Sequence, residues 1–337
     1  MINLINSKTK YMVLMFILII TMFLCFCIGT INISPISVVD AIFSAISGKG
    51  NDTLGNILIN IRIPRVLAAA LVGAALSISG TAMQGLLRNP LADGSTLGVS
   101  SAASLGAVIA ILTGLYLPVI GSTTLFAITF SFIYLIFILF MAYAIDKTLA
   151  TNTIILTGII FSMFISAIIM LLIAFSGNHL RSITFWTMGS LSSTNYNDVW
   201  LMLIVLIVFA SVLLSLGKEI NAFAIGENNA RFIGVNVKKT KLTILIAVAV
   251  LIGTAVSISG TIGFVGLIIP HITRLSFGFD NKKLLPISMI IGAIFLMLCD
   301  LIARTILSPV ELPIGVISSM IGTLFFISIF YKKRRSR

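Results

Sequence analysis

The sequence predicts an all-α polytopic membrane protein with ten transmembrane helices. Of the 337 residues, 58% are hydrophobic and only 9% are charged, whereas a soluble domain has about 25% charged residues. Apolar runs of about 20 residues, long enough to cross the hydrocarbon core of a bilayer, recur along the whole chain. The net charge of +12 comes from basic residues between these runs, where they set membrane orientation, and does not indicate nucleic-acid binding.

The predicted spans are 11–31, 64–86, 95–113, 119–142, 153–175, 197–216, 241–260, 262–278, 284–304 and 312–331. The first run is longer than the apolar core of a signal peptide, so we interpret it as a membrane helix. The seventh and eighth spans are separated at the glycine-rich SGTIG of 259–263, because the apolar run 242–272 is too long for one helix.

The basic residues orient these spans. Ten is an even number, so both termini lie on the same side of the membrane. That side then carries 17 of the 22 Lys and Arg residues, and the other side carries 5. The positive-inside rule therefore places both termini in the cytoplasm.

A repeated phrase suggests how the chain is built. LVGAALSISGT at 71–81 and LIGTAVSISGT at 251–261 are identical at eight of eleven positions, and they belong to spans five apart. An odd separation makes the two copies cross the membrane in opposite directions. The sequence thus predicts a single permease-like domain, 1–337, of two inverted five-helix halves, 1–196 and 197–337. The small residues of the phrase permit close helix packing.

The longest predicted cytoplasmic insertion is 217–241, GKEINAFAIGENNARFIGVNVKKTK. Gly226 and Gly234 should divide it into two short helical pieces, in which Glu227 and Arg231 are i, i+4 partners. An apolar side carried by Ala224, Ala230, Phe232 and Ile233 would lie on lipid or dock in a groove of a partner protein. Its short length favours the partner protein.

Three arginines mark the predicted outer side: Arg62 and Arg65 at the start of the second span, and Arg304 near the end of the ninth, with Asp300 and Glu311 nearby. Arginines at helix ends commonly anchor a protein at the membrane interface. Exposed arginines could instead meet carboxylates of an external protein. The residues alone leave both interpretations open.

The sequence lacks the common motifs of catalysis, phosphate binding and metal binding. The sequence has no phosphate-binding GxxxxGK[ST] loop, no HExxH and only two histidines, so no catalytic, metal or cofactor site is predicted. The three cysteines lie in apolar runs and are interpreted as buried hydrophobic residues. Asp300 is the one candidate intramembrane carboxylate, and an ion-coupled carrier usually needs such groups. A permease driven by a separate ATPase therefore fits better than the alternative, an ion-gradient-driven secondary transporter.

Four stretches carry a family resemblance. They are RIPRVLAAALVGAALSISGTAMQGLLRNPLADGSTLGVSSAASLGA, GENNARFIGVNV, GTIGFVGLIIPHITR and ELPIGVISSMIGTLFF, in this order along nearly the whole chain. They resemble the iron-siderophore and cobalamin permeases of bacterial ABC importers, the type II importers. The resemblance implies a multi-pass protein of the bacterial plasma membrane that imports a ferric siderophore or a related iron, haem or cobalamin chelate by alternating access.

The resemblance also implies partners. These are a second permease, identical or similar, two ATPase subunits that bind ATP and Mg²⁺, and an external substrate-binding protein or lipoprotein. By position, the implied site residues are Arg62, Arg65 and Arg304 for docking of the binding protein; Gly226, Glu227, Ala230, Arg231, Phe232 and Gly234 for coupling to the ATPase; and Asn89, Leu91 and Thr151 for the cytoplasmic gate.

Overall fold

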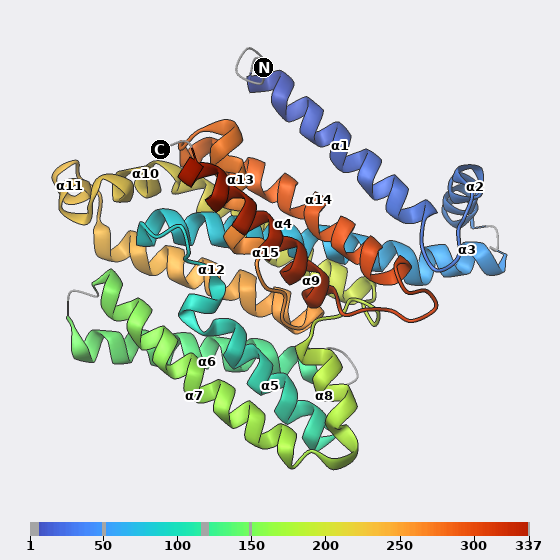
Figure 1. Cartoon of the computed structure of the whole chain (residues 1–337), viewed down its shortest axis with the longest axis horizontal. Helices are drawn as coiled ribbons and strands as arrows, with labels where there is room; N and C mark the ends of the chain where they lie inside the picture. Colours follow the sequence, from blue (N-terminus) through green and yellow to red (C-terminus); the bar gives the residue numbers. More distant parts are fainter. Residues whose placement is uncertain (1–6, 49–51, 116–120, 148–149, 336–337) are drawn as a thin grey trace.

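The computed structural model describes residues 7–48, 52–115, 121–147 and 150–335, in which the regular structure is helical (Figure 1). In chain order the helices are α1 Ser7–Cys27, α2 Pro35–Ile46, α3 Thr53–Ile57, the π-helix η2 Leu58–Arg62, α4 Ile63–Leu87, the 3₁₀ helix η3 Gly94–Leu97, α5 Val99–Thr113, α6 Ser122–Ile145, α7 Thr151–Ala174, the 3₁₀ helix η4 Gly177–His179, α8 Leu180–Thr187, α9 Tyr196–Ser215, α10 Gly217–Ile225, α11 Glu227–Phe232, α12 Val237–Ser259, α13 Val265–Phe277, α14 Asn281–Thr305 and α15 Ile314–Arg335.

Each of the ten predicted spans coincides with one helix, although residues 119 and 120 of the fourth lie outside the described part. The matching helices are, in order, α1, α4, α5, α6, α7, α9, α12, α13, α14 and α15. The first helix ends at Cys27, four residues before the predicted end. At this end, the carbonyls of Phe26 and Cys27 accept hydrogen bonds from Arg62.

Helix length distinguishes two groups. Among the described residues, seven helices are long and apolar enough to cross a membrane: α1, the continuous α3–η2–α4, α6, α7, α9, α12 and α14. The shorter apolar helices are α2, α5, α13 and the 314–328 part of α15. The all-α membrane class is therefore confirmed. Ten complete crossings stay a prediction, because α5 and α13 have 15 and 13 residues and a hydrocarbon core of about 30 Å needs about 20.

Helices α4 and α12 form the centre of the bundle and are buried along most of their length. Glycines allow the other helices to approach α4 closely. A Cβ atom at Gly73 would lie 2.3 Å from the carbonyl oxygen of Gly292 in α14, and one at Gly80 would lie 1.9 Å from that of Gly266 in α13. These distances leave no room for a side chain, which explains the small residues of the first repeat copy.

The two repeat copies run in opposite directions but differ in how they end. In Figure 1, α4 starts beside α3 and α12 starts beside α11, at the other end of the bundle. The first SISGT lies inside α4, which continues to Leu87. The second ends α12 at Ser259, because Gly260 adopts a φ of +64° and breaks the helix. The division into inverted halves 1–196 and 197–337 stays a prediction.

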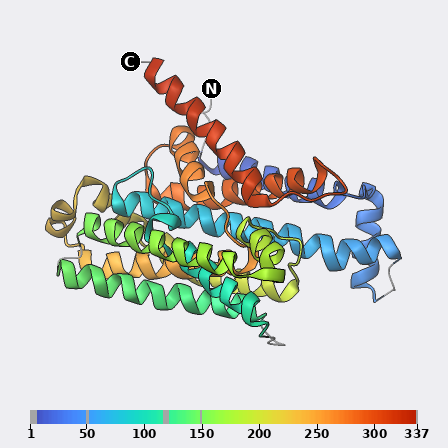
Figure 2. The same ribbon diagram turned by 60° about the horizontal axis from the view of Figure 1, so that its bottom comes forward.

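The bundle has two functional ends, named here by their short helices. Figures 1 and 2 place α10 and α11 at one end, the α11 end, and α2 and α3 at the opposite end, the α2 end. The long helices run between them. Most residues expected to have a function lie at one of these two ends.

Candidate functional site

Glu227 is the centre of the polar contacts at the α11 end. Its Oε1 atom accepts a 2.7 Å hydrogen bond from Thr151 Oγ1, at the start of α7. The same oxygen accepts a 2.9 Å hydrogen bond from Lys241 Nζ in the first turns of α12. Lys241 is buried, and Glu227 supplies it with a carboxylate at ion-pair distance. One carboxylate therefore connects α11 with two long helices.

The environment of Glu227 favours its ionised form. Burial alone would raise the pKa of this carboxyl, but the hydrogen bonds from Lys241 and Thr151 and the charges of Lys241 and Arg88 outweigh that effect, so the pKa is lowered. Arg231, the partner expected from the i, i+4 spacing, is exposed, and Glu227 pairs with Lys241 instead. That prediction was wrong because tertiary contacts offered Glu227 a buried cation.

A second set of contacts holds α10. Asn221 Nδ2 donates a 2.8 Å hydrogen bond to Asp280 Oδ1, and the backbone N–H of Asn281 donates one to Asn221 Oδ1. The hydrogen bond from Asn221, followed by those from the start of α14 and the nearby lysines, lowers the pKa of Asp280 despite some burial. The segment 217–241 is thus attached to α7, α12 and α14.

The structure breaks the segment 217–241 at the predicted glycines. Gly226 has a φ of +127° and Gly234 a φ of +88°, conformations that glycine adopts readily. The expected common apolar side is not formed: Ala230 is fully buried, whereas the Phe232 side chain is 87% exposed and Ile233 is also exposed. Helix α11 thus packs through Ala230 and presents Phe232 and Ile233 outward.

The expected gate residues lie in two neighbouring places. A cavity of about 610 Å³ is lined by Arg88, Thr151, the start of α7 and residues 226–229 and 231 of the coupling segment. Asn89 and Leu91 are not among its lining residues. The Asn89 side chain accepts a hydrogen bond from the backbone N–H of Leu91, which shapes the turn after α4, and Leu91 is exposed.

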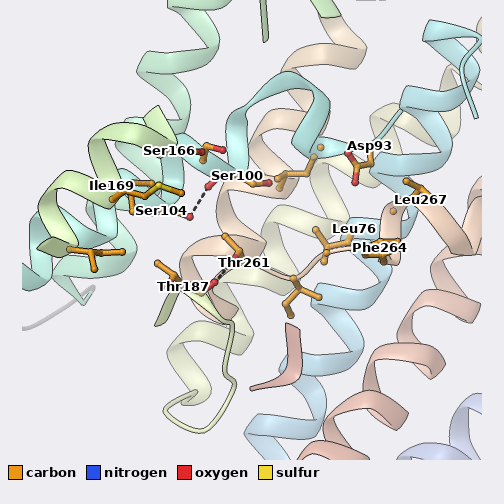
Figure 3. A pocket seen from close by; sticks show the side chains of 18 residues that line it. Leu76, Asp93, Ser100, Ser104, Ser166, Ile169, Thr187, Thr261, Phe264 and Leu267 are labelled. Atoms are coloured by element: carbon orange, nitrogen blue, oxygen red, sulfur yellow. Dashed lines mark hydrogen bonds between the residues drawn. The ribbon is translucent and has the colours of Figure 1, made fainter. Parts of the chain in front are cut away.

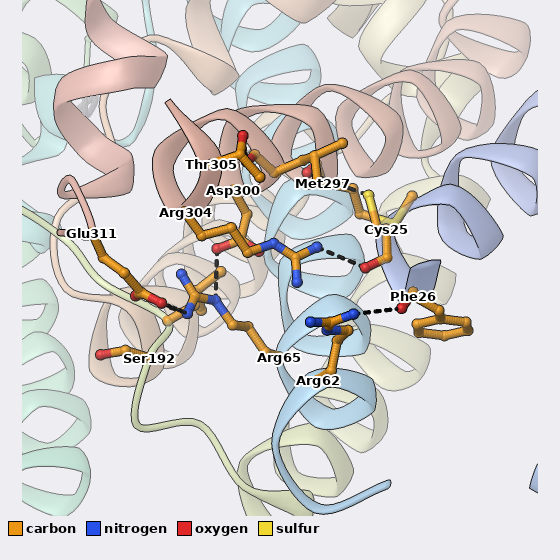
Figure 4. A network of polar contacts seen from close by, with 12 residues as sticks. Cys25, Phe26, Arg62, Arg65, Ser192, Met297, Asp300, Arg304, Thr305 and Glu311 are labelled. Carbon is orange, nitrogen blue, oxygen red and sulfur yellow. Dashed lines mark hydrogen bonds and ion pairs between the residues drawn. The ribbon is translucent and has the colours of Figure 1, made fainter. Parts of the chain in front are cut away.

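At the α2 end, the three arginines are buried rather than exposed (Figure 4). Arg65 Nε donates to Asp300 Oδ1 at 2.9 Å, and its Nη1 lies 2.9 Å from Glu311 Oε2. Arg304 Nε is 3.5 Å from the other Asp300 oxygen. The expected exposure of these arginines was wrong, because carboxylates of the same chain occupy Arg65 and contact Arg304.

Arg62 hydrogen-bonds to backbone carbonyls in the described part of the chain. Its guanidinium donates to the carbonyls of Phe26 at 2.9 Å and Ile31 at 2.6 Å. Arg304 Nη2 likewise donates to the carbonyl of Cys25. Both arginines therefore bind the end of α1 to α4 and α14. The π-helix η2, which ends at Arg62, is a local irregularity of the kind frequent at functional sites.

A second cavity of about 610 Å³, called the central cavity below, lies between α5, α7 and α13 (Figure 3). Its wall mixes apolar side chains with the hydroxyls of Ser100, Ser101, Ser104, Ser166, Thr187 and Thr261. Asp93 is its one charged lining residue and Phe264 its one aromatic residue among the described positions. Such a wall offers weak, distributed hydrogen bonding rather than a charged binding site.

Comparison with known proteins decides the family. The model of the FecCD transport family matches residues 17–332. The chain belongs to the FecCD transport family. This FecCD protein is 47% identical over 295 residues to the uncharacterised ABC transporter permease YvrB of Bacillus subtilis, covering 87% of this chain and 84% of that one. It is 35% identical over 298 residues to the hemin permease HmuU of Yersinia pestis, covering 85% and 86%.

A solved structure agrees with the fold of this FecCD protein. A protein described as a metal-chelate type ABC transporter, in an inward-facing conformation, aligns with a TM-score of 0.86 and 31% identity, covering 97% of this chain and all of the other. The chain is therefore a multi-pass membrane protein and the non-catalytic permease subunit of an ABC importer. Family membership implies ATPase and binding-protein partners. Among the described residues, no group of three or more His, Cys, Asp and Glu could hold a metal ion.

Sequence reasoning on this FecCD permease missed two relationships. The expectations named Glu227 and Thr151 separately, as coupling and gate residues, without the hydrogen bond between them. They noted Asp300 near Arg304 but not its contact with Arg65, which is 235 positions away. Carboxylates this rare in an apolar chain were the available signal, because a buried charge needs a partner.

Proposed function

We propose that this chain imports a ferric siderophore, or a related iron, haem or cobalamin chelate, into the cytoplasm of a bacterium. It would work in the plasma membrane as a dimer with an identical or similar permease, with ten helices crossing per subunit. Two ATPases would bind at the α11 end and a substrate-binding protein or lipoprotein at the α2 end. The excess of Lys and Arg at the predicted cytoplasmic loops supports this orientation.

The contact between Thr151 and Glu227 is the observation that carries the mechanism. The exposed side chains of Phe232 and Ile233 would insert into an apolar groove of the ATPase. A movement of α11 would act on α7 and α12 through Glu227, which contacts both. Since α7 lines the central cavity, ATP-driven movement would change the width of the substrate path. Gly226, Ala230, Arg231 and Gly234 shape this coupling helix, and Asn89 and Leu91 form the neighbouring gate turn.

Docking at the α2 end involves carboxylate exchange in this proposal. Arg65 is shared between buried Asp300 and the partly exposed Glu311. A glutamate of the binding protein would replace Glu311 on Arg65. Arg62 and Arg304 would support the docking surface indirectly, because they hold the end of α1 in place.

The residues that line the central cavity are proposed to form the wall of the substrate path. Its hydroxyls and apolar groups suit a large chelate that passes without tight binding. The names of relatives cover several cargoes, including hemin for HmuU, Fe(3+) dicitrate for FecC of Escherichia coli and molybdate for MolB of Haemophilus influenzae. We infer an iron chelate as cargo, selected mainly by the binding protein.

Reconstitution tests the proposal. The permease, its ATPase and its substrate-binding protein are placed in proteoliposomes, and uptake of radiolabelled ferric hydroxamate, ferric catecholate, ferric citrate, haem and cobalamin is measured. We expect uptake of one of these only with hydrolysable ATP and the binding protein. Uptake by the permease alone under a proton or sodium gradient would instead establish the secondary-transporter alternative.

A further inference from the structure

Helix α2 carries an apolar stripe that no described part of the chain covers. The stripe consists of Ile36, Val39, Phe43 and Ile46, which are 75%, 43%, 66% and 79% exposed. Their spacing of three, four and three residues places them on one face of the helix. A helix with only water around it would bury such an apolar stripe against the protein and turn its polar side outward.

The polar side of α2 lies on another sector of the helix. Ser37, Asp40 and Ser44 line a cavity of about 290 Å³ together with Asp52 and Leu54, and Ser37 and Asp40 are exposed. A third sector, with Val38 and Ala41, is buried against Leu58 of η2. Helix α2 is thus held by its core-facing sector and leaves a polar sector and an apolar sector exposed.

The position of α2 identifies what the stripe faces. Helix α1 has 21 residues, which at about 1.5 Å per residue spans a hydrocarbon core of about 30 Å. At its end, the Ile33 N–H donates to the carbonyl of Cys27, and both residues pack in one cluster with Val38, Ala41 and Leu58. Helix α2 therefore lies directly at the end of a membrane span, where the hydrocarbon meets the headgroups.

Orientation and continuity agree with this level. Both overall views show α2 lying crosswise to α4 (Figures 1 and 2). Because α4 belongs to a helix long and apolar enough to cross the membrane, a crosswise helix runs close to the plane of the bilayer. Ile28 and Ile31, in the link between α1 and α2, are also exposed, as are many apolar side chains of α1. The stripe itself contains no charged residue, whereas a protein interface typically has a polar rim around its apolar core.

We propose that α2 is an interfacial helix, with Ile36, Val39, Phe43 and Ile46 inserted among the lipids at the α2 end. Helices of this kind bury their apolar face about 5–10 Å into the boundary between headgroups and acyl chains. Insertion would fix the link 28–34, and with it the carbonyls of Phe26 and Ile31 that hold Arg62. This inference depends on membrane insertion of the chain and not on the cargo.

Spin-label accessibility in proteoliposomes tests it. Nitroxide labels are placed at Phe43→Cys and Ile46→Cys of the full chain, with Ser37→Cys on the polar side as the matched control. The native cysteines Cys25, Cys27 and Cys299 are buried, and unmodified protein measures their labelling. We expect labels at 43 and 46 to collide more with oxygen, which dissolves in lipid, than with a water-soluble nickel chelate, and the label at 37 to show the reverse.

Two results would overturn the proposal. Greater collision with the nickel chelate at 43 and 46 would place the stripe in water. Low collision with both reagents at these positions would show that protein covers the stripe, either a second copy of the chain or another partner. All three substitutions are at exposed positions, so folding is not expected to limit the measurement.

Discussion

The Thr151 hydroxyl donates a 2.7 Å hydrogen bond to the Glu227 carboxylate, which connects the first residue of α7 with the first residue of α11. Lys241 holds the same carboxylate oxygen from α12. Helix α7 also lines the central cavity. A short helix with an exposed Phe232 is thereby joined to the wall of the proposed substrate path by a single carboxylate.

Removing this hydrogen bond should uncouple ATP hydrolysis from transport. In Thr151→Val the hydroxyl is lost while the size of the side chain is kept. We expect transport per ATP hydrolysed to fall about fivefold to tenfold, as for the loss of about 1–1.4 kcal/mol of interaction. Uptake and phosphate release are measured together in proteoliposomes that contain the complete importer.

Thr153→Val is the matched control, because Thr153 is on the same turn of α7 and the hydrogen bond to α11 comes from Thr151. It should keep the normal ratio of transport to hydrolysis. An equal loss in both variants would mean that α7 tolerates no valine there, and unchanged coupling in Thr151→Val would remove the hydrogen bond from the mechanism.

Acid should weaken the attachment of α11. The pKa of Glu227 is lowered in the folded protein, so the carboxylate stabilises the fold above its unfolded pKa of about 4.3. That contribution is lost as the pH falls through the lower folded value. Glu227→Gln mimics the protonated form, so we expect it to melt below the unmodified protein at pH 7, and we expect the difference to shrink as the pH falls through the lowered folded pKa. Asp40→Asn, at the other end of the molecule, is the control. A difference in melting temperature that stays constant with pH would contradict this account.

The two carboxylates on Arg65 should differ in their effect on stability. The side chain of Asp300 is 1% exposed and that of Glu311 is 35% exposed. Asp300→Asn leaves buried Arg304 without a carboxylate and Arg65 with Glu311 alone, and we expect a loss of about 3–5 kcal/mol in the free energy of unfolding. Glu311→Gln should cost about 0–1 kcal/mol, because the Glu311 carboxylate is partly solvated and Arg65 keeps its ion pair with Asp300.

Unfolding in detergent, followed by melting temperature, compares the two variants. A larger effect for Glu311→Gln would show that Asp300 is not the main partner of Arg65. In the complete importer, Glu311→Gln should also raise affinity for the binding protein, since it frees Arg65 for the incoming carboxylate.

The sequence was informative where local patterns decide structure. Apolar run length located every long helix, and Gly226 and Gly234 located the breaks around α11 because glycine alone adopts their positive φ cheaply. Side-chain partners were not predictable in this way. Arg65 and Asp300 meet only because α4 and α14 pack along their length, which is a property of the tertiary fold.

The same limit explains why the burial of Arg62, Arg65 and Arg304 was not expected. An arginine at the predicted end of a span has the same sequence pattern whether it faces water or turns inward. For Arg62, the deciding factor is the early end of α1, which frees carbonyls for the guanidinium. The apolar residues of α2 were likewise unassigned, because a 12-residue helix is too short to be recognised as a span.

Close packing on α4 gives the last prediction. A Cβ atom at Gly292 would lie 1.8 Å from Ser77 Oγ and 2.4 Å from the Gly73 carbonyl oxygen. Helix propensity favours Gly292→Ala by about 1 kcal/mol, but overpacking against a backbone oxygen costs about 1–3 kcal/mol or more. Because the carbonyl cannot move away without shifting α4, we expect the variant to unfold at lower temperature in detergent. Gly121→Ala, whose new Cβ would find no atom closer than 3.9 Å, should leave the melting temperature nearly unchanged. If Gly292→Ala is as stable as Gly121→Ala, α4 and α14 do not approach as closely as described, and the small residues of the repeat need another explanation than helix packing.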